Sequence, residues 1–226
     1  MNIHFIELRE RLIFCIVFST VIFSILFYFS DILYDLFSIP IKSQLPSKSH
    51  IVAIKIVSTF TVPLKLSFYI SLIVSLPYFI LNLWLFVSPG LYKDEKKSIL
   101  PFLTSSILLF FSGVFFAFYI ICPIALNFFL TCSPSNINIM INIENYLDFM
   151  FTIILGTALS FQIPLIIKCI TKFDIISKKE LTEKRPYVII LAFTIGMLLT
   201  PPDVISQVLL AIPLCILFEI GLLTSK

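Results

Sequence analysis

The chain has 226 residues, of which 59% are hydrophobic and only 13% are charged, and its net charge is +3. Soluble domains contain about 45–50% apolar and about 25% charged residues. A water-soluble fold of this size could not cover so much apolar surface, so the composition excludes that class and predicts an integral membrane protein. The small net charge and the absence of long runs of like charge also argue against a nucleic-acid-binding surface.

The first residues do not have the pattern of a cleavable signal peptide. Acidic and basic residues alternate in the stretch MNIHFIELRER, and no small-residue cleavage site follows the first apolar segment. We therefore expect this apolar segment to remain in the protein as its first membrane-spanning helix.

Six apolar segments are candidates for spanning helices, which need about 20 residues each. We predict a single polytopic membrane domain over 1–226, with helices at 12–30, 66–88, 99–129, 146–168, 187–200 and 204–223. The fifth segment would be only about 21 Å long, against a hydrocarbon core of about 30 Å. Because three residues separate it from the sixth, these two segments should form a short final helical hairpin. A re-entrant hairpin that never crosses is the alternative.

The distribution of Lys and Arg predicts that both ends of the chain lie in the cytoplasm. With a cytoplasmic N-terminus, 12 Lys and Arg residues fall inside and 4 fall outside. Cytoplasmic loops carry this excess in membrane proteins. The first outer loop, 40–63, is too long for a simple turn and contains an amphipathic stretch rich in β-branched residues. We expect it to form a strand or a short interfacial helix that caps the outer face.

Prolines lie within four of the six segments, at Pro77, Pro101, Pro123, Pro164 and Pro213. Proline removes a backbone hydrogen bond and kinks a helix, and neighbouring groups in a bundle can satisfy the freed carbonyls. Kinked helices make curved walls, so we expect a kinked, concave bundle. Ordinary kinks in a packed bundle are the alternative.

Polar side chains inside the apolar segments mark further candidates. A charged group at the centre of a bilayer costs about 2.5–3.5 kcal/mol on insertion scales. Gln162 and Glu219 are expected to face protein, water or a partner helix, although Glu219 lies near the cytoplasmic end and could instead reach the interface. For Asn82, Asn127 and Gln207 we expect interhelical hydrogen bonds, which contribute about 0.6 kcal/mol on average.

No catalytic or cofactor motif is present in the sequence. HExxH, GxSxG and glycine-rich phosphate loops are absent, and the five cysteines have no metal or redox spacing. We therefore expect no enzyme activity, no metal and no cofactor. On physical grounds a small-solute or ion transporter remains open, because transporters also use broken helices and midplane polar groups. A purely structural membrane scaffold is a third possibility.

The polar clusters between the apolar segments resemble those of one family, the TatC subunits of twin-arginine protein translocases. The similar stretches are HFIELRERL (4–12), FVSPGLYKDEKK (86–97), EKRPY (183–187), LLTPPDVISQ (198–207) and AIPLCILFEIG (211–221). They occur in the family's order over nearly the whole chain. The resemblance implies an all-α, six-helix, glove-like bundle, which agrees with the kinks and the short final hairpin.

The resemblance also implies a function that composition cannot show. Members of the family bind twin-arginine signal peptides of folded proteins, work with single-span TatA- and TatB-type subunits, and depend on the proton-motive force. The same is expected here, in the bacterial cytoplasmic membrane, with self-association and with the lipid bilayer but no nucleic acid as a partner. The alternative is a small-solute or ion transporter.

Two groups of site residues follow from the resemblance. The first is expected to bind the signal peptide, and its members are Glu7, Arg9, Phe86 and Glu95. The second consists of functional polar residues in or near the membrane, namely Gln162, Asp203 and Glu219. Many members carry Glu at the position of Gln162, and glutamine keeps the hydrogen bonding of that side chain but not its charge.

The two glutamates of the first group suit a ligand with two adjacent arginines, because guanidinium groups bind carboxylates through paired, charge-assisted hydrogen bonds. Glu7 and Glu95 would converge if the first two helices pack together at their cytoplasmic ends, and Arg9 could hold Glu7 in place. The alternative is that both glutamates only balance nearby cations in solvated pairs that contribute about 0–1 kcal/mol. Those cations are Arg9, Arg11, Lys96 and Lys97.

Overall fold

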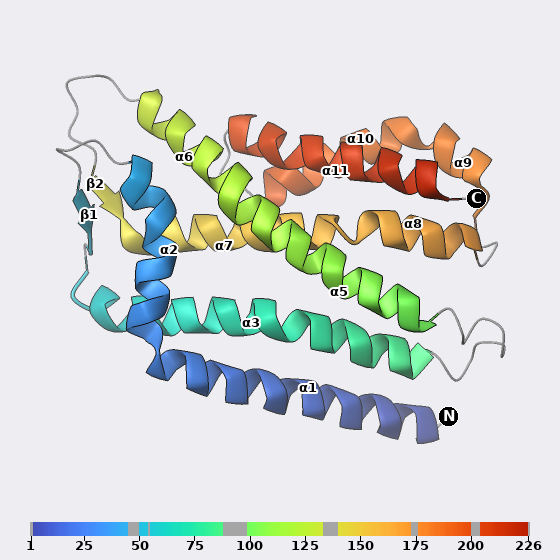
Figure 1. The fold of residues 1–226 in the computed structure, drawn as a ribbon, viewed down its shortest axis with the longest axis horizontal. Helices are drawn as coiled ribbons and strands as arrows, with labels where there is room; N and C mark the ends of the chain where they lie inside the picture. The colour runs from blue at the N-terminus through green and yellow to red at the C-terminus, as the bar shows by residue number, and fades with distance from the viewer. Residues whose placement is uncertain are drawn as a thin grey trace. The chain divides into compact units, whose positions relative to one another are not determined.

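The computed structural model describes residues 2–44, 50–53, 55–87, 99–132, 140–172, 176–199 and 204–225. Within these ranges the chain is almost entirely helical (Figure 1). The helices are α1 (Asn2–Tyr28), α2 (Ser30–Gln44), α3 (Ser58–Val87), α5 (Ile99–Phe116), the π-helical turn η2 (Ala117–Ile121), α6 (Cys122–Thr131), α7 (Ile143–Ser160), α8 (Ile163–Lys172), α9 (Lys178–Glu183), α10 (Arg185–Leu199) and α11 (Val204–Thr224). The strands are β1 (His50–Val52) and β2 (Met140–Asn142).

Five helical stretches of the described chain are long and apolar enough to cross a membrane. They are Ile6–Tyr28, Ser58–Asn82, Pro101–Thr131, Ile143–Lys172 and Ser206–Thr224. The shorter apolar helix Arg185–Leu198 is the predicted fifth segment. These helices confirm the predicted all-α membrane fold with a short helix in the final hairpin.

Two features of the helices differ from the sequence prediction. α3 begins at Ser58, eight residues before the apolar segment 66–88, because a helix continues past the apolar stretch that hydropathy detects. α2 was not predicted, since charged residues at positions 31, 35 and 42 interrupt its apolar pattern. An amphipathic helix of this kind is typical of a segment that is not buried on all sides.

The predicted kinks take two forms in the third and fourth segments. In the third, the π-helical turn η2 lies directly before α6, whose second residue is Pro123. In the fourth, α7 and α8 are separated by a turn at Phe161 and Gln162, just before Pro164. Pro77 and Pro213 instead lie inside continuous helices.

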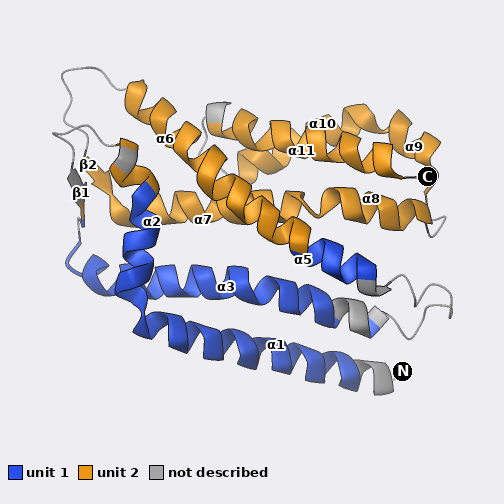
Figure 2. Ribbon diagram, viewed as in Figure 1, with its two compact units in different colours: residues 1–39, 53–107 blue, residues 40–52, 108–226 orange. Residues whose placement is uncertain are grey.

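The chain divides into two compact units (Figure 2). Unit 1 comprises residues 1–39 and 53–107, and unit 2 comprises residues 40–52 and 108–226. In unit 1, α1 packs antiparallel along α3, with the rings of Phe18 and Tyr78 4.4 Å apart. Further along the same interface, the Ser75 hydroxyl donates to the Ser19 hydroxyl at 3.4 Å. The first two spanning helices therefore pack together, which is the arrangement that convergence of Glu7 and Glu95 would need.

In unit 2, α11 packs against both α8 and α10. One apolar cluster on this face contains Ala192, Leu210, Ala211 and Leu214, and another contains Ile167, Phe218 and Leu222. Gly221 allows α11 to approach α8 closely, because a Cβ atom at this position would lie 3.0 Å from the Cα atom of Pro164. Small residues serve this purpose in membrane helix pairs.

Strands β1 and β2 form a two-stranded parallel sheet in unit 2, with Ile51 opposite Ile141. The strand predicted within 40–63 is therefore confirmed for His50–Val52. The pairing joins the loops around 40–63 and 133–145, which the Lys and Arg count assigns to the outer side. Two predicted spanning helices separate these loops, so both loops lie on the same side of the membrane in that topology.

Candidate functional site

Glu7 and Arg11 lie one turn apart on α1 and form an ion pair. The Arg11 Nε and Nη2 atoms donate to the same carboxylate oxygen, Glu7 Oε1, at 3.2 and 2.8 Å. The two side chains keep 34% and 26% of their surface exposed, respectively, so the pair sits at the edge of solvent. A glutamate four residues before an arginine is the favourable order on a helix, because i and i+4 lie on one face.

The cation at Glu7 is therefore Arg11 and not Arg9, which corrects the expectation that Arg9 holds this glutamate. Arg9 is exposed. Residues two apart do not face each other on a helix, so Arg9 points elsewhere from α1. A role for Arg9 in peptide binding stays a prediction.

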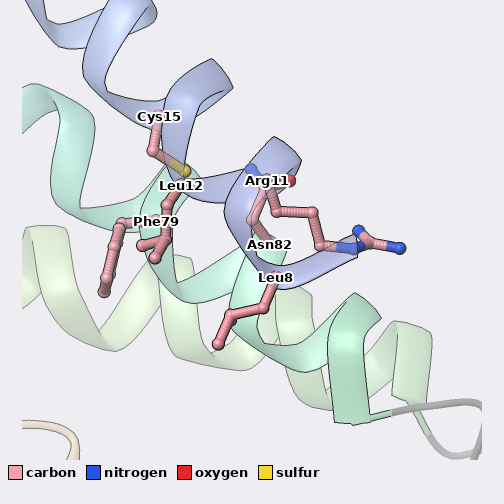
Figure 3. A pocket seen from close by; sticks show the side chains of 6 residues that line it. All are labelled: Leu8, Arg11, Leu12, Cys15, Phe79 and Asn82. Atoms are coloured by element: carbon pink, nitrogen blue, oxygen red, sulfur yellow. The ribbon is translucent and has the colours of Figure 1, made fainter. Parts of the chain in front are cut away.

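A small pocket opens beside this pair, between α1 and α3 (Figure 3). It has room for about one water molecule. Its lining residues are Leu8, Arg11, Leu12, Cys15, Phe79 and Asn82. In Figure 3 the guanidinium of Arg11 points away from the end of the pocket that Phe79 and Cys15 form. The pocket shows that the N-terminal end of α1 lies against the last turns of α3.

The other two residues of the predicted peptide site follow from the end of α3. Phe86 lies in the last turn of this helix and is partly buried. Glu95 lies outside the described residues, in the segment 88–98 that connects α3 to α5. The last turns of α3, which precede this segment in the sequence, lie against the start of α1 in unit 1.

Gln162 lies in the turn that separates α7 from α8, and only 8% of its surface is exposed. Its backbone N–H donates to the Leu159 carbonyl at 3.0 Å, and its own carbonyl accepts from Ile166 at 2.9 Å. It therefore belongs both to the end of α7 and to the start of α8. The expectation that this side chain faces protein rather than lipid is confirmed.

Glu219 forms an ion pair with Arg185, the first residue of α10, with 2.7 Å between Oε2 and Nη2. Both side chains are about half exposed. The carboxylate is thus neither alone in the membrane nor only solvated at the interface. Sequence reasoning missed the partner, although Arg185 stands in the EKRPY stretch that carried part of the resemblance. Asp203, the third residue of this group, lies outside the described residues.

The three predicted interhelical amides behave differently. Gln207 donates from Nε2 to the Phe193 carbonyl at 2.9 Å, which joins α11 to α10 as predicted. For Asn82 the prediction is wrong, because its Nδ2 donates to the Tyr78 carbonyl of its own helix. It is also wrong for Asn127, whose Oδ1 accepts from Thr131 within α6. In both cases a partner one turn away on the same helix was nearer than a second helix.

Within the described ranges, no group of three or more His, Cys, Asp or Glu side chains is placed to hold a metal ion. The chemistry available near Glu7 is that of a carboxylate at the solvent edge, an adjacent guanidinium and a pocket with room for about one water molecule. A carboxylate in this position can bind a cation.

The sequence matches the family model described as "Sec-independent protein translocase protein (TatC)" over residues 3–213. It is 42% identical over 223 residues to the Sec-independent protein translocase protein TatC of Haemophilus influenzae, which covers 99% of this chain and 87% of that protein. The protein of the same name from Escherichia coli is 43% identical over 223 residues, covering 99% and 86%.

The fold is similar to two solved structures. A crystal structure of the twin arginine translocase receptor TatC matches with a TM-score of 0.87 and 31% identity, covering 97% of this chain and 96% of that one. A second, of the same receptor in DDM, matches with a TM-score of 0.89 at the same identity and covers 99% of both chains.

Proposed function

This chain belongs to the TatC family of Sec-independent protein translocases, and from that premise we propose that the paired ends of α1 and α3 bind twin-arginine signal peptides. The relatives supply the class of function, a receptor subunit of a protein translocase in a membrane. The proposed place is supported by the Glu7 carboxylate, which lies near the start of α1 beside the small pocket between α1 and α3. The resemblance further supports folded proteins as cargo and the proton-motive force as the driving force.

The observation that carries this proposal is the packing of α1 against α3. This packing brings the start of α1, which carries Glu7, against the last turns of α3, and Glu95 follows α3 in the sequence. The two adjacent arginines of a peptide would pair with these two carboxylates. Each guanidinium can pair with a carboxylate through two hydrogen bonds. Arg9 is two residues from Glu7 and Phe86 is in the last turn of α3, and both would contact the flanks of the peptide.

The wider setting belongs to the same proposal. Both ends of the chain face the cytoplasm of a bacterial cell, so that the site meets its ligand before export. Single-span TatA- and TatB-type subunits, and further copies of this chain, join it in the membrane. The alternative of a small-solute or ion transporter required a charged group at the midplane, and its one candidate, Gln162, is an uncharged and buried amide.

Photo-crosslinking tests the site. A photoreactive residue at position 6, beside Glu7 and exposed on α1, should crosslink a twin-arginine signal peptide. Glu7→Lys and Glu95→Lys should each abolish that crosslink and the export of folded cargo, while the amount of protein in the membrane stays normal. Lys179→Gln, a charge change on an exposed residue of α9, is the matched control and should crosslink normally. Wild-type crosslinking by Glu95→Lys would show that the site is wrong.

A further inference from the structure

Glu7 is not an empty acceptor in this structure. Two N–H groups of Arg11 already donate to its Oε1 atom. A guanidinium is also the group that the ligand of the proposed function brings to this carboxylate. The resident pair and the incoming pair therefore use the same chemistry at the same carboxylate.

A ligand arginine and Arg11 cannot both make their full contact with Glu7. Paired binding of a guanidinium uses both oxygens of the carboxylate. One of these oxygens, Oε1, already accepts two hydrogen bonds from Arg11. The remaining oxygen, Oε2, accepts no hydrogen bond from the described residues. A twin-arginine peptide would have to open the resident pair before it could bind in this way.

The resident pair is suited to opening. Both side chains are partly exposed, and ion pairs one turn apart on a helix surface are weak because solvent screens them. Arg11 also lines the pocket with Leu8, Phe79 and Asn82, so part of its side chain borders the pocket independently of the contact with Glu7. Resting on the proposed function, we propose that Arg11 is an internal competitor that occupies Glu7 between signal peptides and lowers the receptor's affinity for them.

This role has a quantitative consequence. When only the open form binds, the apparent dissociation constant equals the intrinsic one divided by the open fraction. Removing Arg11 should therefore tighten binding of every cationic peptide by one common factor. For a helix pair of this kind that factor is about two- to threefold. If Arg11 instead only positioned Glu7 for the ligand, its removal would weaken binding.

The experiment titrates a fluorescent twin-arginine signal peptide and its twin-lysine version into membrane vesicles that contain the complete translocase. Arg11→Gln should lower the dissociation constant of both peptides about two- to threefold, with their ratio unchanged. Arg11→Lys keeps the charge but lacks the planar fork, so it should tighten binding by a smaller factor. This variant also serves if Arg11→Gln fails to reach the membrane.

Glu7→Gln separates competition from a general effect of charge. Removing a cation could attract any cationic peptide, and that gain would persist without the carboxylate. Competition for Glu7 would not, so Arg11→Gln should give no tightening in the Glu7→Gln background. Equal tightening in both backgrounds, or none with either Arg11 variant, overturns the internal competitor. If Glu7→Gln by itself leaves peptide binding unchanged, the proposed function of this site is wrong instead.

Discussion

Two ion pairs in the described part of the chain each hold a carboxylate beside a guanidinium. Glu7 pairs with Arg11, one turn along α1, and not with Arg9, which is nearer in the sequence. Glu219 pairs with Arg185 on a different helix. Both pairs are partly exposed, so neither is expected to stabilise the fold strongly. Each pair instead fixes the position of a carboxylate, Glu7 on α1 and Glu219 on α11.

The pair between Arg185 and Glu219 leads to a prediction about stability. Because both side chains are about half exposed, the coupling energy between them should be below about 1 kcal/mol. The measurement is a double-mutant cycle of thermal unfolding with Arg185→Gln, Glu219→Gln and the double variant. A coupling energy of several kcal/mol would contradict the solvated geometry of this pair.

Gln162 leads to a prediction about transport. Replacing its buried amide by Leu removes a polar group from the turn between α7 and α8, and loss of a buried hydrogen-bonding group costs about 1–3 kcal/mol where its partner is left unpaired. Gln162→Leu should therefore reduce export of a folded twin-arginine cargo severalfold while the protein remains in the membrane. Gln162→Glu is the matched control, since it keeps the size and the hydrogen-bonding oxygen. Export at the wild-type rate with Leu would show that this residue only fills space.

At the scale of elements, close approach between helices depends on a few small residues. Gly221 brings α11 against α8, and Gly113 brings α5 to the Cα atom of Ala158, 2.9 Å from where its Cβ would lie. Lipid tails are as apolar as the side chains, so tight packing rather than burial from water favours such contacts. The turn at Gln162 then sets the direction of α8 relative to α7.

The contact at Gly221 predicts the effect of a single methyl group. In Gly221→Ala the new Cβ would lie 2.6 Å from Ile167 Cδ1, which can move, and 3.0 Å from Pro164 Cα, which belongs to the backbone. The two helices must separate, and overpacking of this kind costs about 1–3 kcal/mol. Thermal unfolding in detergent should show the loss. Leu223→Ala, on the exposed side of the same helix, should have little effect, and equal losses would contradict the contact.

At the scale of the whole molecule, the order of the apolar helices and the charges between them are consistent with one topology. With a cytoplasmic N-terminus, 12 Lys and Arg residues fall inside and 4 fall outside, and the paired strands β1 and β2 both fall in loops assigned to the outer side. Within unit 2, the Lys178 ammonium at the start of α9 donates to the carbonyl of Ser225, which directly follows α11, at 2.7 Å. The start of α9 and the end of α11 therefore lie together, as two crossings by α10 and α11 require.

Cysteine labelling in intact cells tests this topology. In a variant without native cysteines, Met140→Cys on β2 should react with an impermeant thiol reagent from outside, because this side chain is 68% exposed. Lys179→Cys on α9 should react only after the cells are opened. The reverse pattern, or outside labelling at both positions, would reject cytoplasmic termini.

The sequence alone determined the class of the protein, the number and order of its apolar helices and the candidate carboxylates, because each crossing must be apolar over about 20 residues and charges must stay outside the core. Only the tertiary structure decided the partners: Arg11 rather than Arg9 for Glu7, and Arg185 for Glu219. It also decided the pairing of β1 with β2 and the turn that divides the fourth segment. Hydropathy records how apolar a segment is, whereas a partner depends on how each helix is rotated and on which helix packs beside it.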